Sequence, residues 1–169
     1  MKDTFIVINQ MQADGIIGNY AIGGAVGATF YLEPSATLDI DIFVAFKNAQ
    51  GSAFISLVPI YDYLRNCKKE GEYIIIGSWQ VQFLPPSSPL EMEALDNAVE
   101  TQVDGVTTWV MTAEHLVAIA LKVGRAKDHN RILQFIETGV LDTSKLDQIL
   151  IRHDLLAKWE QFGDKFLRK

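Results

Sequence analysis

The chain has 169 residues, of which 49% are hydrophobic and 21% are charged, and these values exclude a wholly disordered protein. Asp and Glu number 21 against 15 Lys and Arg, so a net charge of -6 disfavours general binding to nucleic acid. Cys67 is the only cysteine, which excludes an intramolecular disulfide and a zinc site built on several cysteines. The N-terminus lacks a signal-peptide pattern, and no apolar stretch approaches the roughly 18 residues of a membrane span, so we expect a cytoplasmic protein.

The first part of the chain, up to about residue 111, mixes helical and strand patterns. Apolar spacing and turn residues predict helices at 2–14, 25–31, 59–67 and 90–99. Apolar, β-branched runs predict strands at 20–22, 38–46, 73–76, 79–84 and 106–111. A polar, glycine-containing loop is expected at 47–52, and residues 77–78 are typical of a hairpin turn between the two strands that flank them.

From Thr112 onward the pattern is helical only. Thr112 is a suitable N-cap, and Glu114 lies in the first turn, where the helix dipole favours an acidic side chain. Further helices are predicted at 127–138, 143–152 and 155–167, with Gly139 as a C-cap. The expected architecture is an α+β core over residues 1–111, followed by a C-terminal helical bundle over residues 112–169. No linker separates the two parts, so we expect them to pack as one unit.

The strand predicted at 38–46 carries the clearest chemical signal, which is the pair Asp39 and Asp41. Residues two apart on a strand point to the same face, so the two Cα atoms should lie roughly 6.6 Å apart with the carboxylates side by side. Two carboxylates in an otherwise apolar strand repel each other and resist burial, which favours a compensating cation such as Mg²⁺. The alternative is an edge strand with a solvated acidic face, the commoner explanation of an isolated Asp-x-Asp pair.

Gly23 and Gly24 follow the strand at 20–22 and stand directly before a predicted helix. Paired glycines let the backbone approach a ligand closely, and the N–H groups at a helix start bind phosphate. The alternative is a plain turn, which paired glycines mark more often. The order along the chain favours a functional role, because a strand, this turn, a helix and the strand with Asp39 and Asp41 would bring a phosphate binder beside a metal binder.

This order resembles the polymerase-beta-like nucleotidyltransferase superfamily, whose hallmark is a Gly-Gly or Gly-Ser turn followed by an Asp-x-Asp strand. Segments 20–25 and 37–41 are similar to the first motif of the AbiEii-type toxins, a group that includes minimal bacterial nucleotidyltransferases. The residues similar to the late helical motifs of that group are Glu114, His115, Leu116, Lys122, Gly124, Arg125, Lys127 and Asp128. The resemblance covers most of residues 16–160 and implies a nucleotidyltransferase-type fold, with a small mixed β-sheet flanked by helices.

The resemblance also implies roles for the residues of the first motif. Gly23 and Gly24 would hold the triphosphate of an NTP, and Thr37 would support their turn. Asp39 and Asp41 would bind Mg²⁺ that bridges the phosphates of the nucleotide. The implied chemistry is a phosphoryl-type transfer, in which positioning and charge neutralisation do most of the work.

The later motifs imply the rest of the site. Lys122 and Lys127 would offer positive charge to the phosphates, and Asp128 would position or activate an acceptor, for which RNA is a candidate. A role as the toxin of a toxin–antitoxin system would add an antitoxin protein as a partner. No membrane association is expected.

One position departs from the pattern of the superfamily, which usually places a third carboxylate on a later strand. The matching residue is Gln82, whose carbonyl oxygen can coordinate a metal but which is a poor general base. Two functions therefore remain open. The first is a Mg²⁺-dependent nucleotidyltransferase, which the pair Asp39 and Asp41 and the Lys127-Asp128 motif favour. The second is a catalytically degenerate nucleotide-binding or protein-interaction module that keeps the fold, which Gln82 favours.

The histidines and the cysteine are assigned structural roles. His115, His129 and His153 have no spacing typical of a metal site, so each is expected at the surface or in a helix cap. Cys67 lies on the apolar side of its predicted helix, where a buried structural role is favoured over reactivity.

Overall fold

The computed structural model describes residues 1–34, 37, 39–46 and 56–168. Its helices are α1 (Lys2–Ala13), α2 (Gly24–Ala28), α3 (Val58–Tyr63), α4 (Pro89–Asp96), α5 (Ala113–Val123), α6 (Ala126–Thr138), α7 (Thr143–Arg152) and α8 (Leu156–Phe166). Its strands are β1 (Tyr20–Ile22), β2 (Asp39–Val44), β3 (Lys69–Glu70), β4 (Tyr73–Ile76), β5 (Trp79–Leu84), β6 (Val99–Val103) and β7 (Val106–Val110).

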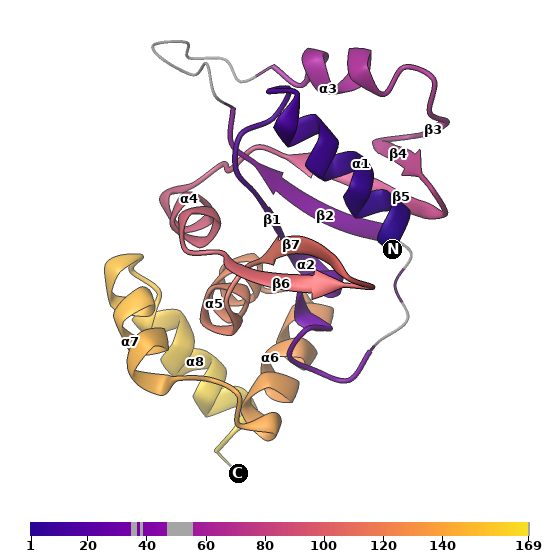
Figure 1. Cartoon of the computed structure of the whole chain (residues 1–169). Helices are drawn as coiled ribbons and strands as arrows, with labels where there is room; N and C mark the ends of the chain where they lie inside the picture. Colours follow the sequence, from indigo (N-terminus) through magenta and orange to yellow (C-terminus); the bar gives the residue numbers. More distant parts are fainter. Residues whose placement is uncertain (35–36, 38, 47–55, 169) are drawn as a thin grey trace.

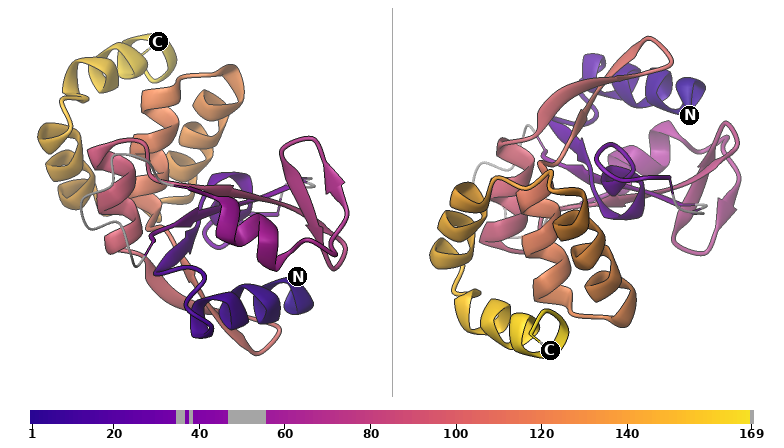
Figure 2. Two further views of the ribbon diagram at one scale, coloured as in Figure 1. Left: turned by 90° about the horizontal axis from the view of Figure 1, so that it is seen from above. Right: turned by 90° about the horizontal axis from the view of Figure 1, so that it is seen from below.

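Within the described residues, the strands form one 7-stranded mixed sheet in the order β3-β4-β5-β2-β1-β7-β6. The central strand β2 pairs antiparallel with β1 and parallel with β5. Helix α1 lies across one face of this sheet, and α5 to α8 gather on the other side (Figure 1; Figure 2). The expected fold class, a small mixed sheet flanked by helices and followed by a C-terminal helical bundle, is confirmed.

One apolar cluster fills the space between α1 and the sheet. Phe5, Ile8 and Met11 recur on one side of α1 at helical spacing and are fully buried. They belong to the same cluster as Ile40 and Ile42 of β2, which alternate with Asp39 and Asp41 along the strand. The apolar side of β2 therefore packs against α1, and its acidic side must point to the opposite face of the sheet.

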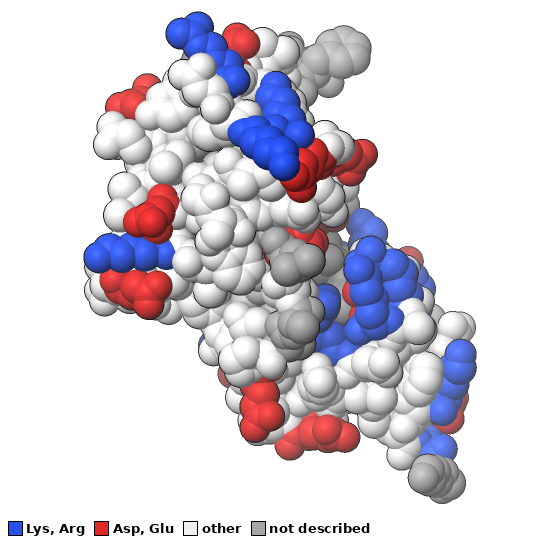
Figure 3. Space-filling view, turned by 90° about the vertical axis from the view of Figure 1, so that its right-hand side faces the viewer, with Lys and Arg blue, Asp and Glu red and all other residues white. Residues whose placement is uncertain are grey.

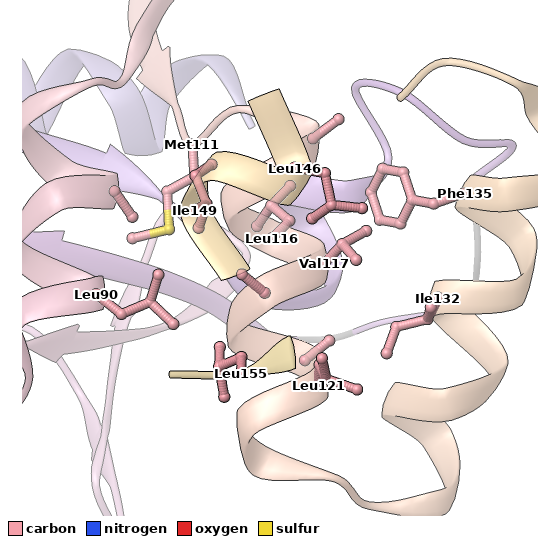
Figure 4. Close-up of a cluster of buried hydrophobic side chains, with 14 of the residues drawn as sticks. Leu90, Met111, Leu116, Val117, Leu121, Ile132, Phe135, Leu146, Ile149 and Leu155 are labelled. Carbon is pink, nitrogen blue, oxygen red and sulfur yellow. The ribbon is translucent and has the colours of Figure 1, made fainter. Parts of the chain in front are cut away.

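A second cluster lies on the opposite side of the sheet and unites it with the C-terminal helices. Phe43 of β2 and Met111, just after β7, join Leu116 of α5 and Phe135 of α6 in this cluster. Figure 4 shows Ile132 and Phe135 of α6 pointing toward α5. Since one continuous core contains residues from before and after position 111, the helical region packs on the core that precedes it.

Most predicted elements are confirmed, and the differences have local causes. The expected helix at 90–99 ends at Asp96 because Val99 already begins β6. Neither β6 nor β3 was predicted from the sequence. The Asp104-Gly105 turn that joins β6 to β7, with φ of 50° and 80°, is the hairpin signal that would have found it. Helices α2 and α3 are shorter than predicted. The expected loop at 47–52 lies outside the described residues.

The helix signals of the C-terminal half are confirmed by the capping geometry. Thr112 accepts a hydrogen bond from the N–H of His115 at the start of α5, and Gly139 ends α6 in the left-handed conformation. Among the described residues, none of these helices or the earlier ones is long and apolar enough to cross a membrane.

Glu93 of α4 ties α4 to α5 and α7 through its carboxylate. Arg152 donates to Oε1 from Nη2 at 2.6 Å, and Nε2 of His153 and of His115 lie 2.7 Å and 3.3 Å from the carboxylate oxygens. The hydrogen bond from Arg152 is the main cause that lowers the pKa of Glu93 to about 2. Of the two positions expected for His115, the surface is wrong, because this residue is only 4% exposed. The helix-cap position is confirmed, since both the N–H and the ring Nδ1 of His115 contact the hydroxyl of the N-cap Thr112.

Replacing Glu93 by Gln should lower the free energy of unfolding by about 2 kcal/mol at pH 7, since charge-assisted hydrogen bonds are lost. The folded-state pKa of about 2 lies below the ordinary value of 4.5, so the contribution of the charged carboxylate is present above pH 4.5 and is lost as the pH falls toward 2. Urea unfolding at pH 7 and pH 3 should therefore show a smaller difference between variant and wild type at pH 3.

A suitable control is Glu160→Gln, because Glu160 is an exposed glutamate of α8. Its effect should stay within about 0.5 kcal/mol at both pH values. An equal cost of Glu93→Gln at pH 7 and pH 3 would show that the charge of Glu93 is not what stabilises the three helices.

Candidate active site

Strand β2 presents Asp39 and Asp41 side by side on the side of the sheet opposite α1. Both are partly buried, while Ile40 and Ile42 between and beyond them are fully buried on the other side. The hydroxyl of Thr37 donates to Oδ1 of Asp39 over 3.1 Å. The expected paired-carboxylate arrangement is therefore present, and Thr37 contacts the first carboxylate directly.

The Gly-Gly turn lies directly against these acids. The N–H of Gly23 donates to the carbonyl oxygen of Asp41 at 2.9 Å. Gly24 has a φ of +57°, and a Cβ atom placed there would overlap Oδ2 of Asp41, while one at Gly23 would lie 2.6 Å from the ring of Phe43. Only hydrogen atoms fit at these two positions, so the turn brings its bare backbone next to the Asp41 carboxylate.

The electrostatics of Asp41 reflect this crowding. Burial raises the pKa of Asp41 above its ordinary value, and the neighbouring charge of Asp39 raises it further. Arg131, Lys127 and Arg125 act in the opposite direction. A divalent cation between the two carboxylates would remove both the repulsion and part of the desolvation cost, so the donor set fits an oxygen-preferring ion such as Mg²⁺.

Gln82 occupies the position beside Asp41 on the next strand. The parallel register of β2 and β5 pairs Asp39 with Gln80 and Asp41 with Gln82. The amide Nε2 of Gln82 donates to Oε2 of Glu72 at 3.0 Å. Among the described residues, no group of three or more His, Cys, Asp and Glu side chains is arranged to hold a metal ion. The third ligand position of the expected site is thus held by an amide.

Replacing Gln82 by Asp should complete a three-acid site and tighten Mg²⁺ binding by about tenfold, because ligand charge raises affinity for this ion. The melting temperature without Mg²⁺ should fall, since a third carboxylate adds repulsion beside Asp41. Thermal unfolding with and without Mg²⁺ measures both effects.

The matched control is Gln80→Asp. Gln80 lies two residues before Gln82 on β5 and pairs with Asp39, but it does not line the cavity that Asp41 and Gln82 share. It adds the same charge and should leave the Mg²⁺ affinity close to that of wild type. Equal behaviour of the two variants would place Gln82 outside the metal site.

A cavity of about 300 Å³ joins these elements. Gly24, Asp39, Asp41 and Gln82 line it on the sheet side, and the start of α6 lines it on the other. Its apolar lining residues are Phe43, Leu84, Met111, Leu116, Ile119, Ala120 and Val123. A cavity lined by acids, cations and apolar side chains suits a ligand that carries both phosphates and a flat ring.

The cations of the site come from α6 and the residue before it. Arg125, Lys127 and Arg131 line the cavity, whereas Lys122, which the resemblance placed with them, is exposed on α5 and is not part of the lining. Figure 3 shows Lys and Arg side chains gathered beside a hollow in one face of the molecule. Arg131 was not predicted as a site residue, although its position one helical turn after Lys127 was the available signal.

Tyr73 and Glu91 also line the cavity and were not anticipated. Tyr73 lies on β4, which pairs antiparallel with β5, and the register of Ile74 with Val81 makes it the neighbour of Gln82. Asp128 lines the cavity as expected, but its side chain is only 2% exposed and is paired with Arg125 at 2.7 Å. Of the predicted site residues, the cavity thus unites all but Gly23, Thr37 and Lys122, and Gly23 and Thr37 contact the acids from outside it.

Comparison with known proteins finds similarity at the level of structure only. No protein-family profile and no curated protein sequence matches the chain. An antigenic nucleotidyltransferase-like protein from Paracoccidioides brasiliensis shares 13% identity with a TM-score of 0.54, over 93% of this chain and 90% of that one. The antibiotic-resistance factor ANT(2'')-Ia shares 12% identity with a TM-score of 0.55, over 99% and 98% of the two chains.

A second structure of ANT(2'')-Ia, in complex with adenylyl-2''-tobramycin, shares 12% identity with a TM-score of 0.51, over 94% of this chain and 99% of that one. The match includes the sheet and the C-terminal helices of this chain, since nearly the whole of it is covered. The chain therefore has a nucleotidyltransferase-type fold.

Proposed function

We propose that this protein is a Mg²⁺-dependent nucleotidyltransferase that moves a nucleotidyl group from an NTP to a hydroxyl of an acceptor. The observation that carries the proposal is the wall of the cavity in which Asp39 and Asp41 lie side by side against Gly24. Paired carboxylates, a backbone free of side chains and cations across the cavity are the groups that phosphoryl-type transfer needs. The nucleotidyltransferase-type fold supports the same activity.

In this proposal each part of the site has one task. Asp39 and Asp41 hold Mg²⁺, which neutralises charge on the phosphates when it is bound. The turn at Gly24 leaves room for the triphosphate to approach Asp41, and Lys127 faces the same phosphates from α6. The oxygen of the acceptor hydroxyl forms a bond to the α-phosphorus and gives its proton to water, the bond from that phosphorus to the bridging oxygen breaks, and pyrophosphate leaves.

The acceptor and the biological role are further parts of the proposal. We propose RNA as the acceptor and a role as an AbiEii-type toxin whose partner is an antitoxin protein, on the strength of the sequence motifs at Gly23-Gly24, Asp39-Ile40-Asp41 and Lys127-Asp128. A cytoplasmic location would suit both the single cysteine and an RNA acceptor. Induced expression in bacteria should then arrest growth, and the Asp39→Asn variant should not.

The direct test is incubation of the protein with Mg²⁺, total RNA and each of the four NTPs labelled at the α-phosphate. Transfer of label to RNA supports the full proposal. A second reaction contains tobramycin in place of RNA, because one structural neighbour was solved with an adenylylated form of that compound. Label on tobramycin would support the transferase activity but show that RNA is not the acceptor. The absence of label from both RNA and tobramycin would overturn transfer to these acceptors.

A second function has one observation in its favour, which is the amide of Gln82 beside Asp41. Without a third carboxylate the site lacks an obvious general base, so a nucleotide-binding module that has lost catalysis is the alternative. It predicts that NTP with Mg²⁺ raises the melting temperature while no label is transferred. The same two measurements therefore separate the two functions.

A further inference from the structure

Asp128 is a buried carboxylate surrounded by guanidinium groups. Oδ2 accepts from Nε of Arg125 at 2.7 Å and from the N–H of Arg125 at 3.2 Å, and Oδ1 accepts from Nη2 of Arg125 at 3.2 Å. Arg131 lies 3.7 Å from Oδ1 on the other side. Burial by itself would raise the pKa of Asp128, but the hydrogen bonds and charge of Arg125 outweigh it, and the pKa lies below its ordinary value.

These contacts exceed what helix capping needs. Capping the start of α6 requires of Asp128 only that its carboxylate accept from the backbone N–H of Arg125. Here the same carboxylate also binds the Arg125 guanidinium with both oxygens, a bidentate geometry that fixes the plane of the guanidinium group. The Arg125 side chain is 58% exposed, so without Asp128 it would be free to sample many rotamers.

The two arginines that Asp128 holds both line the cavity opposite the acidic strand. Arg125 and Arg131 are in its lining with Lys127, and all three stabilise the charged form of Asp41. Asp41 and Asp39 stand on the other wall. A phosphate chain bound through a cation at the two acids would thus face the Arg125 guanidinium, whose plane Asp128 already fixes, with the charge of Arg131 beside it.

We propose that Asp128 is a positioning residue that orients Arg125 beside Arg131, so that the two arginines form a phosphate-binding pair, and that the ligand of this pair is the polyphosphate chain of the bound nucleotide. This inference rests on the proposed function for the identity of the nucleotide, but the chemistry of the subsite is that of a phosphate chain. It differs from the role that the sequence motif implies for Asp128, which is to position or activate the acceptor.

Binding of inorganic tripolyphosphate in the presence of Mg²⁺, measured by isothermal titration calorimetry, tests the inference without any transfer reaction. Removal of a negative charge near the phosphates would by itself tighten binding, whereas loss of the fixed orientation of Arg125 would weaken it. We therefore expect Asp128→Asn to weaken binding by about tenfold. Unchanged or tighter binding by a folded Asp128→Asn protein would overturn the inference.

A double-mutant cycle shows whether Asp128 acts through Arg125. Arg125→Gln should weaken binding by about the same factor as Asp128→Asn, and the double variant should be little weaker than either one. If the two effects multiply, Asp128 does not act through Arg125 and the inference is wrong. Should Asp128→Asn fail to fold, Arg125→Lys tests the inference instead. Arg125 is mostly exposed, and lysine keeps the charge but lacks the guanidinium group that binds both oxygens of Asp128. Wild-type affinity in Arg125→Lys would contradict the proposal.

Glu93→Gln is the matched structural control, since Glu93 is also a carboxylate that binds an arginine and links helices, but it does not line the cavity. It should lower stability and leave tripolyphosphate affinity unchanged. In the transfer assay, Asp128→Asn should raise KM for NTP more than it lowers kcat, while direct action on the acceptor would lower kcat. Failure of wild type to bind tripolyphosphate would overturn the inference, and binding without transfer would overturn only the proposed reaction.

Discussion

Replacing Asp39 and Asp41 together by Asn should lower nucleotidyl transfer by about a thousandfold or more, because the two residues supply the only charged ligands expected at the metal. The rise in melting temperature that Mg²⁺ and NTP cause together in the wild type should disappear. Label transfer and thermal unfolding, measured on the same preparation, check both effects. The matched control is Asp147→Asn, because Asp147 is an exposed aspartate of α7.

The single variant Asp41→Asn should also be more stable than wild type without metal at neutral pH. The folded-state pKa of Asp41 is raised above 3.8 by burial and by Asp39, so its favourable contribution is full below pH 3.8 and is lost as the pH rises through the folded-state value. The gain in free energy of unfolding should therefore appear at pH 7 and vanish near pH 3. If the metal-free variant were less stable than wild type at pH 7, the charged Asp41 carboxylate would not destabilise the folded protein.

Replacing Gly24 by Ala should have the second largest effect, because it disturbs folding and ligand binding together. The residue has a φ of +57°, which side chains rarely tolerate, and its new Cβ would overlap Oδ2 of Asp41. We expect a loss of about 2–4 kcal/mol in the free energy of unfolding. In the fraction that still folds, the displaced Asp41 carboxylate should abolish the stabilisation by Mg²⁺ and NTP.

Gly139→Ala separates backbone strain from the clash with Asp41. Gly139 also has a positive φ, +67°, but an added Cβ there would meet nothing within 4 Å. It should cost only about 1 kcal/mol and leave the response to Mg²⁺ and NTP unchanged. If Gly24→Ala and Gly139→Ala lowered the free energy of unfolding equally, the clash with Asp41 would contribute nothing to the cost of Gly24→Ala.

The parts of the site that lie close together in the sequence could be predicted from it. The alternation of Asp39, Ile40 and Asp41 determines which side chains share a face of β2, since the period of a strand is a local property. The Gly23-Gly24 turn was likewise apparent from residue type alone, and so were the hairpin of β4 and β5 and most of the C-terminal helices. Each of these features depends on neighbours only a few positions away.

What the sequence could not provide was the packing of distant elements. That Arg131 rather than Lys122 lines the cavity depends on how α5 and α6 turn against the sheet. The burial of His115 depends on Glu93, which is 22 positions away in the sequence. Strand β6 was missed because its residues are largely exposed, so it lacks the apolar alternation by which strands are recognised.

The alternation along β2 has a consequence for folding itself. If β2 paired with β1 or β5 one residue out of register, Asp39 and Asp41 would enter the layer beneath α1, and Ile40 and Ile42 would leave it. Two carboxylates without partners in an apolar layer would make such a misaligned state far less stable than the native one. The residues that we expect to bind the metal therefore also select the correct strand alignment while the chain folds, and a chain without them would discriminate less well between alignments.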